Sequence, residues 1–251
     1  MNSLFAGIQI IMPGETAQAH RHTANAFRFI IEGESAYTTV NGGERVHMRP
    51  GDLLLTPRLV LARPLPRGDG PMMWLDGLDF PLTNAFEAGF FELYGDRTQK
   101  SVVPDDLSSR TYIHGRLNPP VWETPPQSAS SPVSNYPWAE TERALAAIGD
   151  DIDGSPSDGS CSSTPTRGPV VRSCPPSTAG SSDCAPGFVG APARTTASTI
   201  LHVVRGWRDG RDRGEHLRPR AQGRRGGARL GPLPDRQRDA VPVRGHGRLR
   251  L

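Results

Sequence analysis

The stretch that decides the fold of this chain is residues 13–33, Pro13-Gly-Glu-Thr-Ala-Gln-Ala-His20-Arg-His22-Thr-Ala-Asn-Ala-Phe-Arg-Phe-Ile-Ile-Glu-Gly33. Its two histidines lie between a Pro-Gly turn and a run of aromatic and β-branched residues that favours a strand. Alternate residues of a strand face the same side, so both imidazoles can reach one point. Two neutral imidazoles suit zinc, copper, nickel or non-haem iron. A bare His-x-His pair is also typical of an exposed edge strand, and the surrounding sequence favours the metal site.

The residues around this stretch predict an all-β unit over residues 1–95. Turn signals at Pro13-Gly14, Asn41-Gly42 and Pro50-Gly51 separate short runs of strand-forming residues. Those runs are residues 4–12, 27–31, 37–40, 45–48, 53–57 and 72–75. Several short strands with turn residues between them indicate a β-sandwich or barrel.

The chain changes character after this unit. Residues 96–150 are predicted to be a connector, with proline-rich coil followed by an amphipathic helix at residues 138–148. Apolar residues also recur at helical spacing over residues 83–93. Residues 151–251 are predicted to be a degraded second unit with a largely disordered tail, because Ser, Pro, Gly and Thr dominate first and Arg, Gly and Pro afterwards.

A short repeat supports the idea of a second unit. Thr23-Ala-x5-Ile-Ile-x-Gly33 recurs as Thr196-Ala-x5-Val-Val-x-Gly206. The places of His20 and His22 are taken in the second copy by Ala193 and Thr195. If the chain is duplicated, only the first copy carries the two imidazoles.

Composition and charge narrow the class of protein. The 251 residues carry a formal charge of +3, and 28 of the 29 basic residues are arginine, 14 of them within residues 201–251. Nucleic-acid binding by this tail is a weak alternative, because acidic residues dilute it and aromatic residues do not alternate with the arginines. No apolar run is long enough for a membrane span, and no signal peptide is recognisable. Three cysteines fit neither a disulfide framework nor a zinc spacing, so we expect a cytoplasmic protein. From the charge and hydropathy patterns together, we expect neither a nucleic-acid nor a membrane partner.

The spacing Gly14-x5-His20-x-His22-x3-Ala26-x6-Gly33 resembles the first motif of the cupin superfamily, in which Ala26 is usually Glu. The first half of the second cupin motif is present as Gly51-x5-Pro57. A finer resemblance is to gentisate 1,2-dioxygenase and its relatives acting on salicylate and 1-hydroxy-2-naphthoate. It is carried by residues 19–23, 28–33, 50–52 and by Trp74-Leu-Asp-Gly-Leu-Asp79, and it is dense over residues 4–93. It implies a cupin jelly-roll barrel in a chain that is truncated relative to the family.

The resemblance also implies a function and a set of site residues. His20 and His22 would be two ligands of Fe(II), and Arg28 would hold the carboxylate of the substrate. Gln9 would contact the substrate, and Asp76 would be a polar catalytic residue near the site. The implied reaction is extradiol-type cleavage of a small hydroxylated aromatic carboxylate with O2. Members of the family are typically homo-oligomers, so we expect one here.

The substrate-side assignments have structural alternatives. Without the resemblance, Arg28 is equally consistent with a surface arginine, and Asp76 with the end of a strand before Gly77. Gln9 lies within an apolar strand where an uncompensated amide would be costly, which favours a functional role.

The third histidine of the family is missing from this sequence. Where the family has Trp-His-Asp-His, this chain has Leu61-Ala62-Arg63-Pro64, so alanine takes the place of the ligand. Three facial ligands are the usual minimum for such an iron site. We therefore expect weak iron retention and impaired activity. The alternative function is a non-catalytic cupin that binds a small aromatic carboxylate.

The genetic code suggests a cause that can be tested. The codons CTG-GCA-CGA-CCA-C for residues 61–64, read one base later, become TGG-CAC-GAC-CAC, which encode Trp-His-Asp-His. We predict a local frameshift here, with the frame restored by Gly68-Asp69-Gly70-Pro71. The same kind of cause would explain the arginine-rich tail. Sequencing of the gene should show adenine as the third base of the codons for Ala62, Arg63 and Pro64. Any other third base in these codons would contradict the hypothesis.

Overall fold

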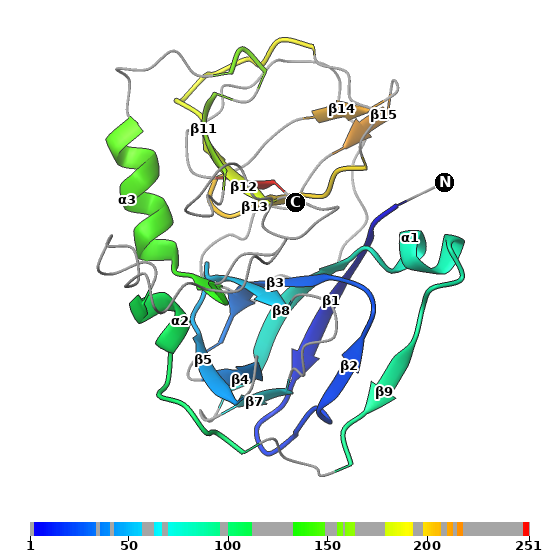
Figure 1. Cartoon of the computed structure of the whole chain (residues 1–251). Coiled ribbons are helices and arrows are strands. Elements are labelled where there is room, and N and C mark those ends of the chain that lie inside the picture. Colours follow the sequence, from blue (N-terminus) through cyan, green and yellow to red (C-terminus); the bar gives the residue numbers. More distant parts are fainter. Residues whose placement is uncertain are drawn as a thin grey trace, which may run out of the picture.

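The computed structural model describes residues 3–33, 36–40, 43–56, 63–66, 70–95, 100–111, 133–148, 155–157, 159–163, 179–192, 198–206, 210–212, 215–217 and 248–250. A group of short strands forms an N-terminal barrel, and a second, smaller group of strands lies above it in Figure 1. Helix α3 (Trp138–Ile148) runs between the two groups at one side. The all-β prediction is confirmed for the barrel.

The barrel is made of one five-stranded and two smaller sheets, in the orders β1-β8-β3-β6-β10, β5-β4-β7 and β2-β9. Its strands are β1 (Phe5–Ile11), β2 (His20–His22), β3 (Ala26–Glu32), β4 (Ala36–Val40), β5 (Glu44–Met48), β6 (Leu53–Thr56), β7 (Arg63–Pro66), β8 (Met72–Leu78), β9 (Phe91–Leu93) and β10 (Asn135–Tyr136). Two short helices, α1 (Phe80–Ala85) and α2 (Leu107–Ser109), join them.

The second group of strands lies in the region predicted to be a degraded second unit. Its four-stranded sheet has the order β11-β12-β16-β13, and β14 pairs with β15. The strands are β11 (Ser160–Ser163), β12 (Gly180–Asp183), β13 (Leu201–Val203), β14 (Gly210–Asp212), β15 (Glu215–Leu217) and β16 (Arg248–Arg250). Most of residues 207–251 lie outside the described part of the chain, so the predicted disorder of the tail and the domain boundaries at 95 and 150 stay predictions.

The two faces of strand β3 point to the inside and to the outside of the barrel. Ile30 packs into the interior cluster with Trp74, whereas Phe27 and Phe29 pack into a second, outer cluster. In the antiparallel register, Arg28 lies opposite Asp76 and therefore faces the same side as that residue. This alternation is the expected one for a strand that is buried on both faces.

The outer face of the barrel is covered by residues from the far end of the chain. Ala179, Ile200 and Val204 pack against the outer cluster, and the ring centroid of His202 lies 4.9 Å from that of Phe29. Ile200, His202 and Val204 belong to the short repeat found in the sequence. The second copy therefore packs directly on the first.

The repeat is longer than the segment that first reveals it. Ala6-Gly7-x5-Pro13-Gly14 recurs, at the same spacing from Thr23, as Ala179-Gly180-x5-Pro186-Gly187 before Thr196. The last glycine of each turn has a φ of +80°, a conformation that glycine adopts without strain. Residues 6–33 and 179–206 thus align in sequence without a gap, and the residues of β12 align with those of β1. The internal duplication proposed from the shorter repeat can be extended over both segments and stays a prediction.

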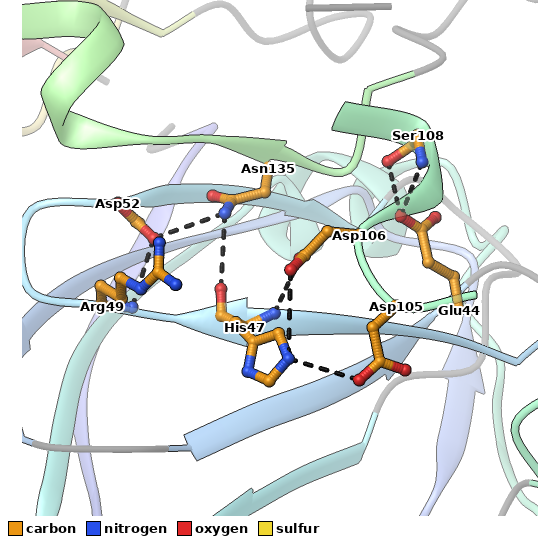
Figure 2. Close-up of polar contacts among 8 residues, drawn as sticks. All are labelled: Glu44, His47, Arg49, Asp52, Asp105, Asp106, Ser108 and Asn135. Carbon is orange, nitrogen blue, oxygen red and sulfur yellow. Dashed lines mark hydrogen bonds and ion pairs between the residues drawn. The ribbon is translucent and has the colours of Figure 1, made fainter. Parts of the chain in front are cut away.

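The connector is attached to the barrel through buried carboxylates (Figure 2). Glu44 of β5 accepts hydrogen bonds from the backbone N–H of Ser108, at 2.9 Å, and from its hydroxyl, at 2.8 Å. Asp52 accepts from the backbone N–H of Trp138 at 2.9 Å and from the Asn135 side chain at 3.3 Å. Buried charges require such partners, so residues 106–109 and 133–138 are bound to the barrel rather than loosely tethered to it.

One expected helix differs from the structure. Residues 83–93 have apolar side chains at helical spacing, but the helix α1 ends at Ala85 and residues 91–93 form strand β9. The chain turns after the helix at Glu87, which has a φ of +53°. Strand β9 then pairs with β2, a tertiary contact that overrides the local periodicity. The helix predicted at residues 138–148 is confirmed as α3.

Among the described residues, no helix is both long enough and apolar enough to cross a membrane.

The buried carboxyl of Asp52 predicts a pH dependence of stability. Burial raises the pKa of Asp52 above its ordinary value of 3.8, although hydrogen bonds from Trp138, Asn135 and Arg49 oppose the shift. Just above pH 3.8 the folded chain therefore binds more protons than the unfolded chain, so this group makes the free energy of unfolding fall as pH rises. Urea unfolding over this range should show a slope that is less negative for Asp52→Asn than for the parent. Equal slopes for the two chains would contradict the prediction.

Candidate functional site

The histidine strand β2 is held by strand β9. His20 lies opposite Leu93 and His22 opposite Phe91 in an antiparallel pair. The ring of Phe91 stacks on the ring of His20, with centroids 5.0 Å apart. Between the two histidines, Arg21 points outward and forms an exposed ion pair with Glu92. Strand alternation thus places both imidazoles on the side away from this ion pair, as the sequence predicted.

Backbone carbonyls set the tautomer of both imidazoles. Nδ1 of His20 lies 2.9 Å from the carbonyl oxygen of Gln18, and Nδ1 of His22 lies 2.7 Å from that of Ala24. A carbonyl only accepts, so the hydrogen-bond pattern assigns a proton to each Nδ1 and a lone pair to each Nε2. The ring centroids are 5.7 Å apart. This is the usual arrangement in which histidine presents Nε2 to a metal ion.

The electrostatic environment keeps His22 in the neutral form that binds metals. Burial lowers the pKa of His22 from its ordinary value of 6.5, and the charge of His20 lowers it further. The hydrogen bond to Ala24 and the carboxylates of Asp79 and Asp76 raise the pKa and oppose the effect of burial. Desolvation has the largest effect, so the neutral imidazole is favoured near neutral pH.

A buried polar cluster joins strands β3 and β8. Nε of Arg28 donates to Oδ1 of Asp76 at 2.9 Å, and Nε1 of Trp74 donates to Oδ2 of the same carboxylate at 2.9 Å. The guanidinium carbon of Arg28 also lies 4.7 Å from the centroid of the Trp74 ring. The side chains of Arg28 and Asp76 are only 10% and 8% exposed, so Arg28 is not a surface arginine. The alternative that Asp76 merely ends a strand is also wrong, because β8 continues to Leu78.

One nitrogen of this cluster lacks a partner. Nη1 of Arg28 is buried and makes no hydrogen bond to any described residue. An unsatisfied buried donor costs about 1–3 kcal/mol, and more when the group is charged. The geometry therefore leaves a charged donor ready for an anionic ligand, while Asp76 and Trp74 hold the guanidinium in place.

Gln9 differs from the expectation of burial. The register places it opposite Trp74, on the inward-facing side of edge strand β1, but its side chain is exposed. The cost of burying its amide is therefore no argument for a functional role. Its contact with a substrate stays a prediction.

The structure does not supply a third metal ligand among the described residues. No group of three His, Cys, Asp or Glu side chains within that part of the chain is arranged to hold a metal ion. His47 is bound instead to the connector, with Nε2 3.3 Å from Oδ2 of Asp105 (Figure 2). Position 62, where the sequence has alanine, lies outside the described residues. The two imidazoles fit iron, and the remaining ligand of the expected triad is not seen.

One pair of buried residues beside the histidines was not predicted from the sequence. Asn25 donates its backbone N–H to Oδ1 of Asp79 at 2.7 Å and its side-chain amide to Oδ2 at 2.6 Å. Asp79 is the last residue of the Trp74–Asp79 motif, which was the signal that could have pointed to it. The bonds fix the loop between β2 and β3 against the end of β8.

A family model of the cupin domain matches residues 7–77. This range begins in β1 and ends in β8, and it contains the two histidines, Arg28 and Asp76. The match supports the predicted cupin architecture. It covers the two histidines and the Arg28–Asp76 cluster but not Asp79, strand β9 or the C-terminal segment.

Longer relatives and solved structures match beyond this domain. Gentisate 1,2-dioxygenase 1 of Aquipseudomonas alcaligenes is 40% identical over 146 residues, which cover 58% of this chain and 41% of the relative. 1-Hydroxy-2-naphthoate 1,2-dioxygenase of Nocardioides sp. (strain KP7) is 35% identical over 214 residues, which cover 82% and 52%. The chain thus spans about half the length of these curated relatives, or less.

The solved structure of salicylate 1,2-dioxygenase from Pseudoaminobacter salicylatoxidans with gentisate adducts is 28% identical, with a TM-score of 0.77. The match covers 99% of this chain and 67% of that one, so the similarity of fold includes the connector and the second group of strands. The cupin domain, the named dioxygenase relatives and this structure agree, and together they support the gentisate dioxygenase family for this chain.

Proposed function

We propose that the barrel binds a hydroxylated aromatic carboxylate at Arg28 and Fe(II) at His20 and His22, and that it is the site of gentisate 1,2-dioxygenase-like ring cleavage. The observation that carries the proposal is the buried Nη1 of Arg28, which has no partner among the described residues. A substrate carboxylate would supply the missing acceptor.

The substrate class follows from this nitrogen and from the relatives. The names of the relatives include gentisate, 5-aminosalicylate and 1-hydroxy-2-naphthoate dioxygenases. Each of these substrates has a ring carboxylate beside a hydroxyl group. Asp76 occupies Nε of Arg28 and leaves Nη1 for the carboxylate, while the Trp74 ring limits the movement of the guanidinium. The site is thus organised before the ligand arrives, which lowers the entropic cost of binding.

The metal would be held by the two nitrogens that the backbone leaves unprotonated. When bound, Fe(II) would supply the redox chemistry with O2 that the protein side chains lack. The residues of the chain would orient the ring: Arg28 through its carboxylate and Gln9 at the open side of the barrel. Asp76 would act through Arg28 rather than by contact with the substrate.

The alanine at position 62 favours weak iron retention and reduced turnover in this chain. Two imidazoles leave the site short of the three protein ligands usual for non-haem Fe(II). The same observation supports the second candidate, a non-catalytic cupin that binds the carboxylate without turning it over. A homo-oligomeric state, a cytoplasmic location and the absence of nucleic-acid binding also stay predictions.

The first test concerns the carboxylate. Arg28→Lys keeps the positive charge but removes the planar fork, so we expect gentisate to bind about 10-fold to 100-fold more weakly. Isothermal titration with gentisate measures this, and the thermal unfolding midpoint shows whether the barrel is intact. Arg21→Lys, at the exposed ion pair on β2, is the matched control and should bind gentisate as the parent does. Equal affinity of Arg28→Lys and the parent would contradict the assignment.

The second test concerns the metal. Ala62→His should restore a third ligand and tighten Fe(II) binding by at least about tenfold, because loss of groups that support a metal commonly costs 10-fold to 100-fold. Anaerobic titration with Fe(II) measures affinity, and oxygen uptake with gentisate measures turnover. Ala62→Leu changes the same position without adding a ligand and should gain neither property. Gentisate binding without oxygen uptake in both the parent and Ala62→His would favour the non-catalytic binder.

A further inference from the structure

The peptide group between Ala24 and Asn25 joins a buried acid to one of the two histidines. Its N–H, which belongs to Asn25, donates to Oδ1 of Asp79 at 2.7 Å. Its carbonyl, which belongs to Ala24, accepts from Nδ1 of His22 at 2.7 Å. Both hydrogen bonds therefore act on the two ends of a single planar unit.

We propose that Asp79 is a positioning residue that acts on His22 through this peptide, fixing the Nδ1–H tautomer and strengthening Nε2 as a metal ligand. The proposal rests on the assignment of His22 as a ligand. Metal-binding histidines commonly donate the other ring nitrogen directly to a carboxylate or a carbonyl. Here a carbonyl is the acceptor, and a carboxylate lies one hydrogen bond behind it.

The physical link is the polarisation of the amide. An anion that accepts the N–H draws positive charge toward that end and leaves more negative charge on the oxygen of the same amide. Hydrogen bonds in such a chain strengthen one another, and a low local dielectric enlarges the effect. Asp79 is 2% exposed and Asn25 is 6% exposed, so water does not screen the chain at its acidic end. A stronger acceptor at Ala24 then holds the proton of His22 on Nδ1.

The geometry of helix α1 argues against an ordinary capping role for this acid. Asp79 is the N-cap residue of α1, a position where an aspartate side chain usually accepts from the first turn. Its side chain makes no capping hydrogen bond, and its two oxygens accept from Asn25 instead. The carboxylate thus serves the histidine loop.

His20 provides an internal comparison. Its Nδ1 bonds to the carbonyl of Gln18 at 2.9 Å. Within the described part of the chain, no carboxylate is seen to accept from the peptide that carries this carbonyl. A change at Asp79 should therefore affect His22 and leave His20 unaltered.

The test uses the full chain, labelled with ¹⁵N at its histidines and free of metal. Long-range ¹H–¹⁵N correlation spectra at alkaline pH report which nitrogen carries the proton. In the parent chain we expect the Nδ1–H form at His22. Asp79→Asn keeps the shape and removes the charge, so His22 should shift toward the Nε2–H form while His20 does not. Titration with Co²⁺ alone should show an affinity about tenfold lower for Asp79→Asn.

Asn25→Ala distinguishes polarisation through the peptide, here called the relay, from a clamp, in which Asp79 only holds the loop in place. It keeps the backbone N–H that bonds to Asp79 and removes only the side-chain amide, so the tautomer of His22 should stay as in the parent. Equal shifts of His22 in Asn25→Ala and Asp79→Asn would overturn the relay and leave a clamp.

The parent chain also decides the question if Asp79→Asn does not fold. An Nε2–H tautomer at His22 in the parent would overturn the proposal, and an Nδ1–H tautomer retained in Asn25→Ala would support it. If the parent chain binds no Co²⁺, the metal-site proposal fails, and the tautomers still decide whether the relay exists.

Discussion

A guanidinium inside a β-barrel needs an anion beside it, and the register of β3 against β8 supplies one. Arg28 faces Asp76 across this pair, and the carboxylate also accepts from Trp74. Removing one partner of a buried pair leaves an uncompensated charge, which is strongly destabilising. The site and the stability of the barrel therefore depend on the same pairing. Because a slip of one residue reverses every side chain, this pairing also determines what the outside of the barrel presents.

The pairing of β3 with β8 determines which residues face the outside of the barrel. With Arg28 and Ile30 inside, Phe27 and Phe29 must face outward, and residues from the second copy of the repeat cover them. Phe29 and His202 each lie four residues before the closing glycine of their copies, so equivalent positions touch one another. Contacts between equivalent positions are typical of two-fold interfaces between identical subunits. Here the arrangement occurs within one chain.

Much of the barrel and part of the site could be predicted from the sequence. Turn residues and strand-forming runs indicate the all-β unit, and His20, His22 and Arg28 follow from strand alternation and the family motif. Strand β9 could not be predicted, because its helical spacing is overridden by pairing with β2. The exposure of Gln9 depends on its being in an edge strand, and the bonds between Asn25 and Asp79 join residues far apart in sequence. Local patterns contain neither kind of information.

The two copies of the repeat differ in the side chains they carry. The first copy has histidines at positions 20 and 22 and a buried arginine at 28, whereas the second has Ala193, Thr195 and Leu201 at the equivalent places. The residues proposed to bind metal and substrate in this repeat are thus confined to one copy. The second copy retains what covering the first requires, namely the turn at Pro186-Gly187 and the apolar or aromatic side chains that face Phe27 and Phe29. Because burial of apolar surface stabilises the fold whether or not a metal is bound, the second copy can lose every ligand and keep its structural role.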